Sequence, residues 1–374
     1  MQVVDAAGLP IGDDYPPRIM GVLNVSSESP YDPSVFDDPG EAARYVDEQL
    51  IDEGADIVDV GLESANKRFE VLSAEEELAR LDTAVEAIES VSGEAVFSIE
   101  TRYHEVARAA LDRGFEMVND ICGFADPEMP RVCREYDVAV VKMASPPDLD
   151  RPGAVEDVDD IYDALFQNGV TDKTIVDPAF GGWSEEKTLA DDRETFRRLR
   201  EFRAIGQPIL VSINRKNFLR DIAGRSTDEA LPVSLAATSM AVERGAHVVR
   251  THDVAETRDA VLVGHAFARD RLRDSRDDVA VEELDVTTVR EASRHLGTVE
   301  ADADPSRTVG RLFVLEGLSG EARTRLADAA ADTDALVTTA GQGDPDQVVL
   351  GGPVATLGEL ADRVSAPADL REAL

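Results

Sequence analysis

The chain has 374 residues, which is enough for one large core and a smaller second domain. Hydrophobic residues make up 43% of it, as in globular proteins, and no apolar run reaches the roughly 18 residues of a membrane-spanning helix. We expect a cytoplasmic protein with no membrane partner, because the first residues lack the basic and apolar runs of a secretion signal. Cys122 and Cys133 are too few for a disulfide framework and lack metal-ligand spacing.

The charge is strongly negative. There are 76 acidic and 38 basic residues, giving a formal net charge of -38, and only five of the basic residues are lysines. Such a chain repels itself in dilute salt, whereas molar salt shortens the Debye length to about 3 Å. The composition is therefore typical of halophilic archaea. It argues against nucleic acid as a partner, because phosphate backbones require a basic surface.

Short β-rich runs alternate with helical patterns over the first 270 or so residues. Leu78, Leu81, Val85 and Ile88, for example, recur at the three- and four-residue spacing of one helix face. The eight predicted strands are Ile19–Val25, Ala55–Gly61, Ala95–Thr101, Glu116–Ile121, Val138–Met143, Thr174–Pro178, Pro208–Ile213 and His247–His252.

Eight strands that alternate with helices suggest a closed parallel barrel or an open doubly wound sheet. Most of these strands end in polar residues, which in a barrel converge on one rim, where the active sites of such barrels lie. No G-x-G-x-x-G follows the first strand, which weakens a dinucleotide-binding reading. The pattern therefore favours a TIM-type (β/α)₈ barrel over residues 18–272.

The pattern changes after Leu272. Residues 273–285 are acidic, and we interpret them as a linker. Residues 286–374 alternate short strands and helices, which predicts a small α+β appendage. It carries no chemical motif, and its Gly341, Gly343, Gly351 and Gly352 are interpreted as turn glycines.

Several predicted strand ends carry carboxylates and amides. Glu100, Asn119 and Asp177 end the third, fourth and sixth strands. Such groups in one pocket suit the hydrogen-bonding edge of a pterin or guanine-like ring; singly, each is as well explained as a helix cap. Asn24 ends the first strand and could ligate a hard cation through its amide oxygen, or simply bond within its loop.

Basic residues follow the last two strands. Lys216 comes just after the seventh, and Arg250 and His252 lie two residues apart on the eighth, so that both face the same side. This is the place of the frequent anion site of TIM barrels, and a pyrophosphate would suit it. The alternative for His252 is helix capping or a core hydrogen bond.

These same stretches resemble the signatures of dihydropteroate synthases, in the family's order, from about Arg18 to Leu272. The similar strings are IMGVLNVSSES, GADIVDVGLES, SIETRYHEVARAAL, GFEMVNDICGF, TIVDPAF, PILVSINRKNF and GAHVVRTHDV. The resemblance implies a TIM barrel, often dimeric, that joins 6-hydroxymethyl-7,8-dihydropterin pyrophosphate to p-aminobenzoate with Mg²⁺.

The resemblance also implies residue roles. Asn24 would help to hold Mg²⁺ and the pyrophosphate. The pterin ring would be bound by Glu100, Asn119 and Asp177. Lys216 would contact the pterin near the incoming arylamine, and the pyrophosphate would be bound by Arg250 and His252. A homodimer is the expected assembly.

The sequence departs from the family pattern around the acceptor substrate. The pterin-binding aspartate is Glu100, and the usual T-P-D-S and T-R-P-G loops read Ser26–Ser29 and Ala65–Arg68. Lys142 stands where a histidine is usual, and the glycine-rich stretch that normally bears a lysine reads Ala179–Ser184, with Lys187 a few residues on.

Three functions are therefore open. The first is a dihydropteroate synthase that uses p-aminobenzoate. The second is a relative that joins the pterin to another acceptor or transfers methyl groups from a reduced pterin. The third is a non-catalytic paralogue that binds a pterin.

Overall fold

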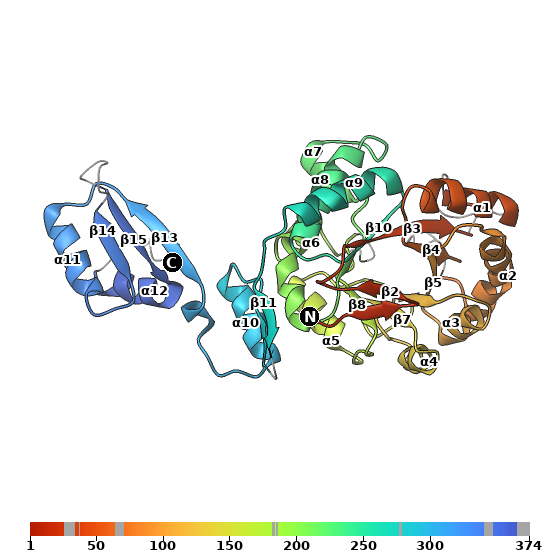
Figure 1. The fold of residues 1–374 in the computed structure, drawn as a ribbon, viewed down its shortest axis with the longest axis horizontal. Coiled ribbons are helices and arrows are strands. Elements are labelled where there is room, and N and C mark those ends of the chain that lie inside the picture. Colours follow the sequence, from red (N-terminus) through yellow and green to blue (C-terminus); the bar gives the residue numbers. More distant parts are fainter. Residues whose placement is uncertain are drawn as a thin grey trace. The chain divides into compact units, whose positions relative to one another are not determined.

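The structure, a computed structural model, contains two compact units (Figure 1), Met1–Asp270 and Arg271–Leu374. It describes residues 1–25, 34–36, 38–63, 71–181, 184, 186–276, 279–339 and 347–364. The altered loops at 26–29 and 65–68 and the glycines 341 and 343 lie outside these residues.

The first unit is built on eight parallel strands, each predicted from the sequence. Their order in the sheet is β8-β7-β6-β5-β4-β3-β10-β9, and a parallel bridge between Val176 and Ile209 joins β8 to β9. The sheet thus closes into the predicted TIM-type (β/α)₈ barrel. The strands are β3 (Arg18–Asn24), β4 (Ile57–Gly61), β5 (Val96–Thr101), β6 (Met117–Asp120), β7 (Ala139–Met143), β8 (Thr174–Asp177), β9 (Leu210–Val211) and β10 (Val248–Thr251).

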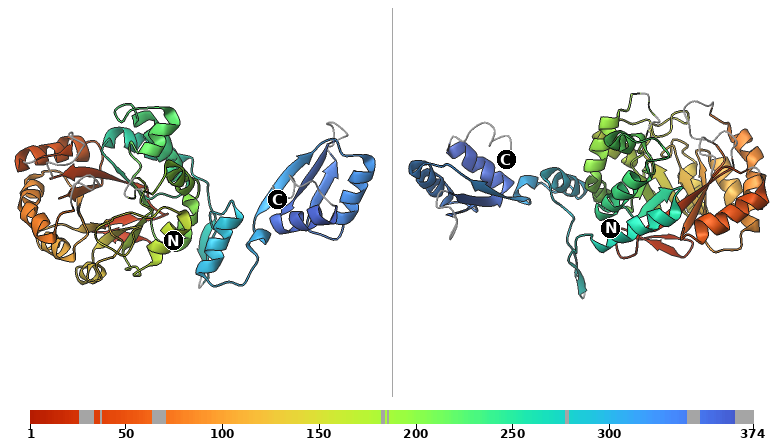
Figure 2. Two further views of the ribbon diagram at one scale, coloured as in Figure 1. Left: turned by 180° about the vertical axis from the view of Figure 1, so that it is seen from behind. Right: turned by 90° about the horizontal axis from the view of Figure 1, so that it is seen from above.

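Helices surround these strands (Figures 1 and 2). Capping boxes begin two of them: Ser73 with Glu76 before α2, and Thr188 with Asp191 before α6. The helices are α1 (Pro39–Tyr45) with a π-helical continuation (Val46–Ile51), α2 (Ala74–Ser90), α3 (His104–Leu111), α4 (Met129–Glu135), α5 (Val158–Phe166), α6 (Leu189–Arg197) with a 3₁₀ turn (Leu199–Ile205), α7 (Asn217–Ala223), α8 (Leu231–Glu243) and α9 (Val254–Ala266).

An N-terminal hairpin that the sequence analysis did not predict covers the floor of the barrel. Its strands are β1 (Val4–Ala6) and β2 (Leu9–Ile11), which pair antiparallel. Val4, Ala6 and Ile11 are buried in one cluster with the first inward-facing residues of the barrel strands, such as Met20 and Ile57. The hairpin therefore seals the amino-terminal end of the barrel with an apolar layer, and the opposite rim is left for chemistry.

Buried charges join the hairpin segment to the barrel. Both carboxylate oxygens of Asp13 accept from Arg203, at 2.9 and 2.8 Å, and Asp13 also lies 3.1 Å from Nε2 of His247. Nδ1 of His247 accepts from the amide of Ile209, so the ring proton is on Nε2 and points at Asp13. His247 and Arg203 hold the pKa of Asp13 well below its usual range, although burial opposes them.

The second unit contains a three-stranded antiparallel sheet in the order β13-β15-β14. Helices α11 and α12 pack on one face of it, with Ala330 of α11 and Leu357 of α12 in one cluster with Phe313 and Leu350 of the sheet. Leu312 and Val314 point away from that core and are exposed. Residues 273–285, which we interpreted as a linker, contain a hairpin. The elements are β11 (Arg273–Arg276), β12 (Val279–Glu282), α10 (Val289–Thr298), a 3₁₀ turn (Pro305–Arg307), β13 (Gly310–Leu315), α11 (Gly320–Ala330), β14 (Leu336–Thr339), β15 (Val348–Pro353) and α12 (Val354–Arg363). Among the described residues, no helix of either unit has the length and apolarity needed to cross a membrane.

The Asp13 network generates a stability prediction. Asp13→Ala leaves Arg203 and His247 buried without their carboxylate, and breaking a buried pair costs about 3–5 kcal/mol. We expect a loss of that order in the free energy of unfolding, measured by denaturant titration at high salt. Asp14→Ala, which removes the same charge one residue later, is the control. Equal stabilities of the two variants would contradict the role of Asp13.

Candidate active site

The alternation of side chains along the strands decides which polar residues meet inside the barrel. Successive side chains of a strand point to opposite faces. The floor cluster fixes Met20, Ile57 and Val248 as inward-facing. Positions two and four residues further along the same strands are therefore inward too, which brings Asn24, Asp59 and Arg250 into the barrel. By the same rule Glu100, Asn119 and Asp177 face inward from β5, β6 and β8.

Asp59 lies at the centre of this group. It is fully buried in the middle of β4. Its Oδ1 accepts from Ser98 Oγ at 2.8 Å, and its Oδ2 accepts from Asn119 Nδ2 at 2.9 Å and from Arg250 Nε at 2.8 Å. One carboxylate thus joins residues of β5, β6 and β10 within the barrel.

Arg250 bridges two carboxylates. Besides donating to Asp59, its Nη2 donates to Glu100 Oε2 at 2.7 Å. Burial, together with the neighbouring charges of Asp59 and Glu63, raises the pKa of Glu100 to about 7, against the lowering effect of Arg250. Two acids that share one guanidinium leave a negative charge uncompensated, which favours ligands that donate hydrogen bonds to Glu100.

Lys216 and Asp177 lie at the same rim. Burial and Arg250 lower the pKa of Lys216, whereas Asp177 raises it. Burial raises the pKa of Asp177 to about 6 although Lys216 and Arg250 lower it. The lysine stem passes close to Gly181, where a Cβ atom would lie 3.0 Å from Nζ, and Gly181 also has a φ of +112°. Any side chain at 181 would therefore be strained and would displace the lysine.

His252 lies just past the end of β10, where the charges of Arg250 and Lys216 act on it. Burial and the positive charge of Arg250 lower its pKa to about 3, so it enters as a neutral imidazole rather than as a cation. Arg215, which precedes Lys216, takes no part. Its Nε and Nη2 donate to the two oxygens of Asp253 at 2.8 and 2.9 Å, and its Nη1 donates to two backbone carbonyls.

Asn24 is held in a defined orientation at the end of β3. Its Nδ2 donates to Ser34 Oγ at 2.9 Å, so its amide oxygen is directed elsewhere. A Cβ atom on Gly61 would lie 3.2 Å from Asn24 Oδ1 and 3.7 Å from Glu100 Oε1. The missing side chain of Gly61 therefore leaves room between two oxygen atoms at the rim.

Lys142, a strand-end lysine, points away from the site. Alternation along β7 places it on the helix side, where Nζ donates to the carbonyls of Leu165 at 2.9 Å and Gly169 at 2.8 Å and also to that of Gln167. Burial lowers its pKa to about 8. Lys142 thus caps the carboxyl end of α5, and our expectation that the polar strand ends all converge on the rim is wrong for it. It is wrong also for Asp120, whose oxygens accept from the amides of Cys122 and Phe124.

Described residues on either side of the altered acceptor loop make defined hydrogen bonds. Glu63, the last described residue before it, accepts from Arg102 Nη2 at 2.5 Å and from the amide of Leu72, on the other side of the segment, at 3.0 Å. Tyr103 donates to the carbonyl of Leu72 at 2.7 Å. The side chain of Lys187, which follows the altered glycine-rich stretch, is buried and pairs with Asp192 at 3.4 Å.

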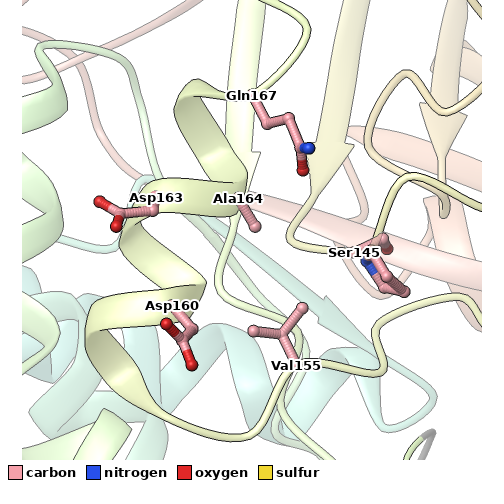
Figure 3. A pocket seen from close by; sticks show the side chains of 7 residues that line it. Ser145, Val155, Asp160, Asp163, Ala164 and Gln167 are labelled. Atoms are coloured by element: carbon pink, nitrogen blue, oxygen red, sulfur yellow. The ribbon is translucent and has the colours of Figure 1, made fainter.

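Two further features lie apart from these residues. A surface groove of about 420 Å³ beside α5 is lined by Ser145, Val155, Asp160, Asp163 and Gln167, and no predicted site residue reaches it (Figure 3). His104, Glu105 and Asp126 form a cluster with metal-ligating atoms. Asp126 there accepts from the amides of His104 and Glu128 at 3.0 Å each, as a capping residue does.

Comparison with known proteins identifies the chain. Residues 20–252 match the family described as pterin binding enzyme. The dihydropteroate synthase of Clostridium beijerinckii is 32% identical over 258 residues, which are 67% of this chain and 94% of that protein. The chain belongs to the dihydropteroate synthase family of pterin-binding enzymes.

Haloarchaeal members of this family are also similar. A probable bifunctional folylpolyglutamate synthase/dihydropteroate synthase of Haloferax volcanii is 36% identical over 273 residues, and its counterpart in Halobacterium salinarum is 35% identical over 260. The matches cover 68% and 66% of this chain but only 31% of each relative. The chain thus spans about a third of these bifunctional proteins.

Solved structures of the family share the barrel. A dihydropteroate synthase of Coxiella burnetii in complex with pteroic acid has a TM-score of 0.60 at 28% identity, with 71% of this chain and 98% of that one covered. The Thermus thermophilus enzyme in complex with 4-aminobenzoate has a TM-score of 0.58 at 29% identity, with 71% and 100% covered.

The structure brings most of the predicted residues together in this family member. Glu100 and Asn119 meet through Asp59 and Arg250, and Lys216 reaches the same rim. Sequence reasoning missed Asp59. A signal was present, because an acid in the middle of the fully buried run Ile57–Gly61 requires a cation or several donors inside the barrel.

Glu77 on α2 is a further buried acid beside this network. It accepts a hydrogen bond from Thr101 Oγ1 at 2.6 Å. Burial raises the pKa of Glu77 to about 7, and the charge of Glu63 adds to this effect, whereas the hydrogen bond from Thr101 opposes it. Between the ordinary pKa of 4.5 and about 7, the folded chain keeps a proton that the unfolded chain releases. Glu77 therefore favours folding most below pH 4.5, and this contribution is lost as the pH rises to about 7.

Glu77→Gln removes this titration and keeps an oxygen for Thr101. We expect the variant to gain up to about 3 kcal/mol of unfolding free energy relative to wild type as the pH rises from about 4.5 to about 8. Denaturant titrations at several pH values and constant high salt measure this difference. Glu75→Gln, an exposed neighbour outside the capping box, is the control, and a pH-independent difference for Glu77→Gln would contradict the assignment.

Proposed function

We propose that this chain is a dihydropteroate synthase that condenses 6-hydroxymethyl-7,8-dihydropterin pyrophosphate with p-aminobenzoate. The main support is the convergence, on one barrel rim, of the acceptors Glu100, Asn119 and Asp177 with the cations Lys216 and Arg250. Family members with this barrel include structures in complex with pteroic acid and with 4-aminobenzoate.

The acceptors suit the pterin ring. The ring carries an amino–amide edge that donates hydrogen bonds, and carboxylates accept such donors in a planar, bidentate way. Asp177 receives the amide of Ala179 on Oδ1 at 2.8 Å, which leaves Oδ2 for a ligand. Because the pKa values of Asp177 and Glu100 are raised to about 6 and 7, bound donors at both groups would favour their ionised forms.

The cations suit the pyrophosphate and the reaction. In the proposed step the arylamine nitrogen forms a bond to the pterin methylene carbon, the bond from that carbon to the pyrophosphate oxygen breaks, and the nitrogen releases one proton. Arg250 is held in place before the substrate arrives and, with Lys216, stabilises the charge that develops on the leaving oxygen. Neutral His252 contributes a hydrogen bond. The pocket aligns the methylene with the amine, which removes much of the entropic cost.

Mg²⁺ fits the residues present. The oxygen of Asn24 borders the room above Gly61, and Mg²⁺ prefers one or two protein oxygens together with substrate phosphates and water. We propose that Asn24 helps to hold Mg²⁺, which when bound with the substrate neutralises pyrophosphate charge.

The setting that we propose is a salt-rich cytoplasm, with no nucleic-acid partner, because the net charge is -38. We also propose a homodimer. Met240, Leu262, Val263 and Phe267, on and just after helices α8 and α9, are between 45% and 81% exposed, and such an apolar group suits a second copy of the chain.

The direct test is an assay at high salt with Mg²⁺, dihydropterin pyrophosphate and p-aminobenzoate, in which dihydropteroate and pyrophosphate are measured. We expect equal amounts of both products. Lys216→Ala should lower turnover by at least about 100-fold with little change in stability, because it removes a site cation at the rim.

Lys142→Met is the matched control. It should cost about 1–3 kcal/mol of stability, since buried carbonyls lose their donor, yet keep turnover per folded molecule. Wild-type turnover in Lys216→Ala would contradict the site. Pterin pyrophosphate binding without product would indicate another acceptor or a non-catalytic paralogue, and a corrinoid requirement would indicate methyl transfer.

The charge predicts a salt-dependent fold. We expect the thermal midpoint to rise by at least about 10 °C between about 0.2 M and about 3 M KCl, because screening removes self-repulsion. Thermal melts at intermediate salt concentrations measure this. Sucrose is the control, because it stabilises folded proteins by being excluded from their surface and does not screen charges. A midpoint that does not respond to KCl would contradict the halophilic assignment.

A further inference from the structure

We propose that Asp59 is the positioning residue of the pterin pocket, fixing at once the amide of Asn119 and the guanidinium of Arg250. The inference rests on the proposed function and deepens it. Gly61 ends β4 at the rim, and Asp59 precedes it by two residues on the same inward face. Asp59 therefore lies deeper in the barrel than the groups that face a ligand.

The hydrogen bonds of Asp59 fix the orientation of the side chains around it. Three donors from three other strands converge on its two oxygens at 2.8 to 2.9 Å, and the side chain is fully buried. A carboxylate offers acceptors only, so each of these partners has to turn an N–H or O–H toward it. No amide or hydroxyl side chain of the same size can receive three donors without presenting one of its own.

This constraint orients Asn119. Asn119 directs one amide N–H at Asp59, and among the described residues no hydrogen bond engages its Oδ1. The second N–H and the oxygen therefore remain, side by side and in a fixed order, for a ligand. Such a pair matches a ring edge on which an acceptor and a donor are neighbours, and an inverted amide would oppose it.

The same carboxylate orients Arg250. Nε is bound to Asp59 and Nη2 to Glu100, so two bonds on one edge fix the plane of the guanidinium. Nη1 is left for an anion, within the part of the chain that the structure describes. A cation that is fixed before the substrate binds needs no reorganisation during the reaction, which is the condition for electrostatic stabilisation of a leaving group.

The alternative is that Asp59 serves stability alone. Asp59→Leu tests the positioning role. Leucine is close to aspartate in size but accepts no hydrogen bond, so Asn119 and Arg250 both lose the group that orients them. In Asp59→Asn, by contrast, the amide oxygen can still accept from both donors while the amide nitrogen donates to Ser98 Oγ, so this variant weakens the arrangement without abolishing it.

The experiment measures binding of 6-hydroxymethyl-7,8-dihydropterin, without pyrophosphate, by calorimetry at high salt, and then kcat and KM for both substrates. For Asp59→Leu we expect a loss of roughly 100-fold in kcat/KM for the pterin substrate and weaker binding of the pterin alcohol, with KM for p-aminobenzoate nearly unchanged. Asp56→Asn, which removes the same charge three residues earlier at the floor end of β4, should match wild type.

A second variant covers failure of Asp59→Leu to fold. Asp59→Asn keeps a hydrogen-bond partner for Ser98, Asn119 and Arg250, so it should fold, yet its neutral oxygen holds Asn119 and Arg250 less firmly than a carboxylate, and we expect roughly 10-fold weaker binding of the pterin alcohol. Wild-type binding and kcat/KM in either variant, whatever the change in thermal midpoint, would overturn the proposal. If wild type itself does not bind the pterin alcohol, the proposed function fails, and this inference fails with it. If wild type binds the pterin alcohol normally and Asp59→Leu or Asp59→Asn binds it equally well, only the positioning role of Asp59 is contradicted.

Discussion

The site depends on one buried ionic arrangement: the carboxylate of Asp59 holds Arg250, which in turn holds Glu100. A cation inside a barrel requires a counter-charge, because an unpaired buried charge is expensive. The two carboxylates carry more negative charge than one guanidinium neutralises. The pocket therefore favours a ligand that donates hydrogen bonds. In the proposed function, the same guanidinium keeps one nitrogen for a phosphate, so a single cation would serve both halves of the substrate.

Much of this arrangement could be predicted from the sequence because a barrel repeats one rule. Short apolar runs alternating with amphipathic helices specify eight parallel strands, and closure brings their ends to one rim. The period of two then places Arg250 inside the barrel with Glu100, Asn119 and Asp177. The resemblance to the family added the roles of Glu100, Asn119 and Asp177, which composition alone leaves equivalent to helix caps.

Other features depended on contacts that no local pattern encodes. Lys142 lies within β7, where alternation directs it outward to cap α5. Lys216 lies after β9, at the start of α7, and its direction into the site follows from the path of that loop rather than from strand alternation. Arg215 is next to Lys216 but is bound to Asp253, thirty-eight residues away in sequence. The N-terminal hairpin was missed because its three-residue strands are too short for a periodic signal, and its burial comes from the barrel floor.

The charge of the chain and the charge of the site have to be considered together. A protein with a net charge of -38 repels an anion at long range, which works against the pyrophosphate binding that we propose. At molar salt this repulsion is screened within about 3 Å, whereas contacts between buried groups are screened much less. In the proposed function, Arg250 and Lys216 therefore act on the substrate only after it has entered the barrel, at contact distance. The surface can be tuned for solvation in salt while the interior keeps the positive charges that the proposed reaction requires, because both cations are largely buried and Asp59 holds Arg250 where salt does not reach.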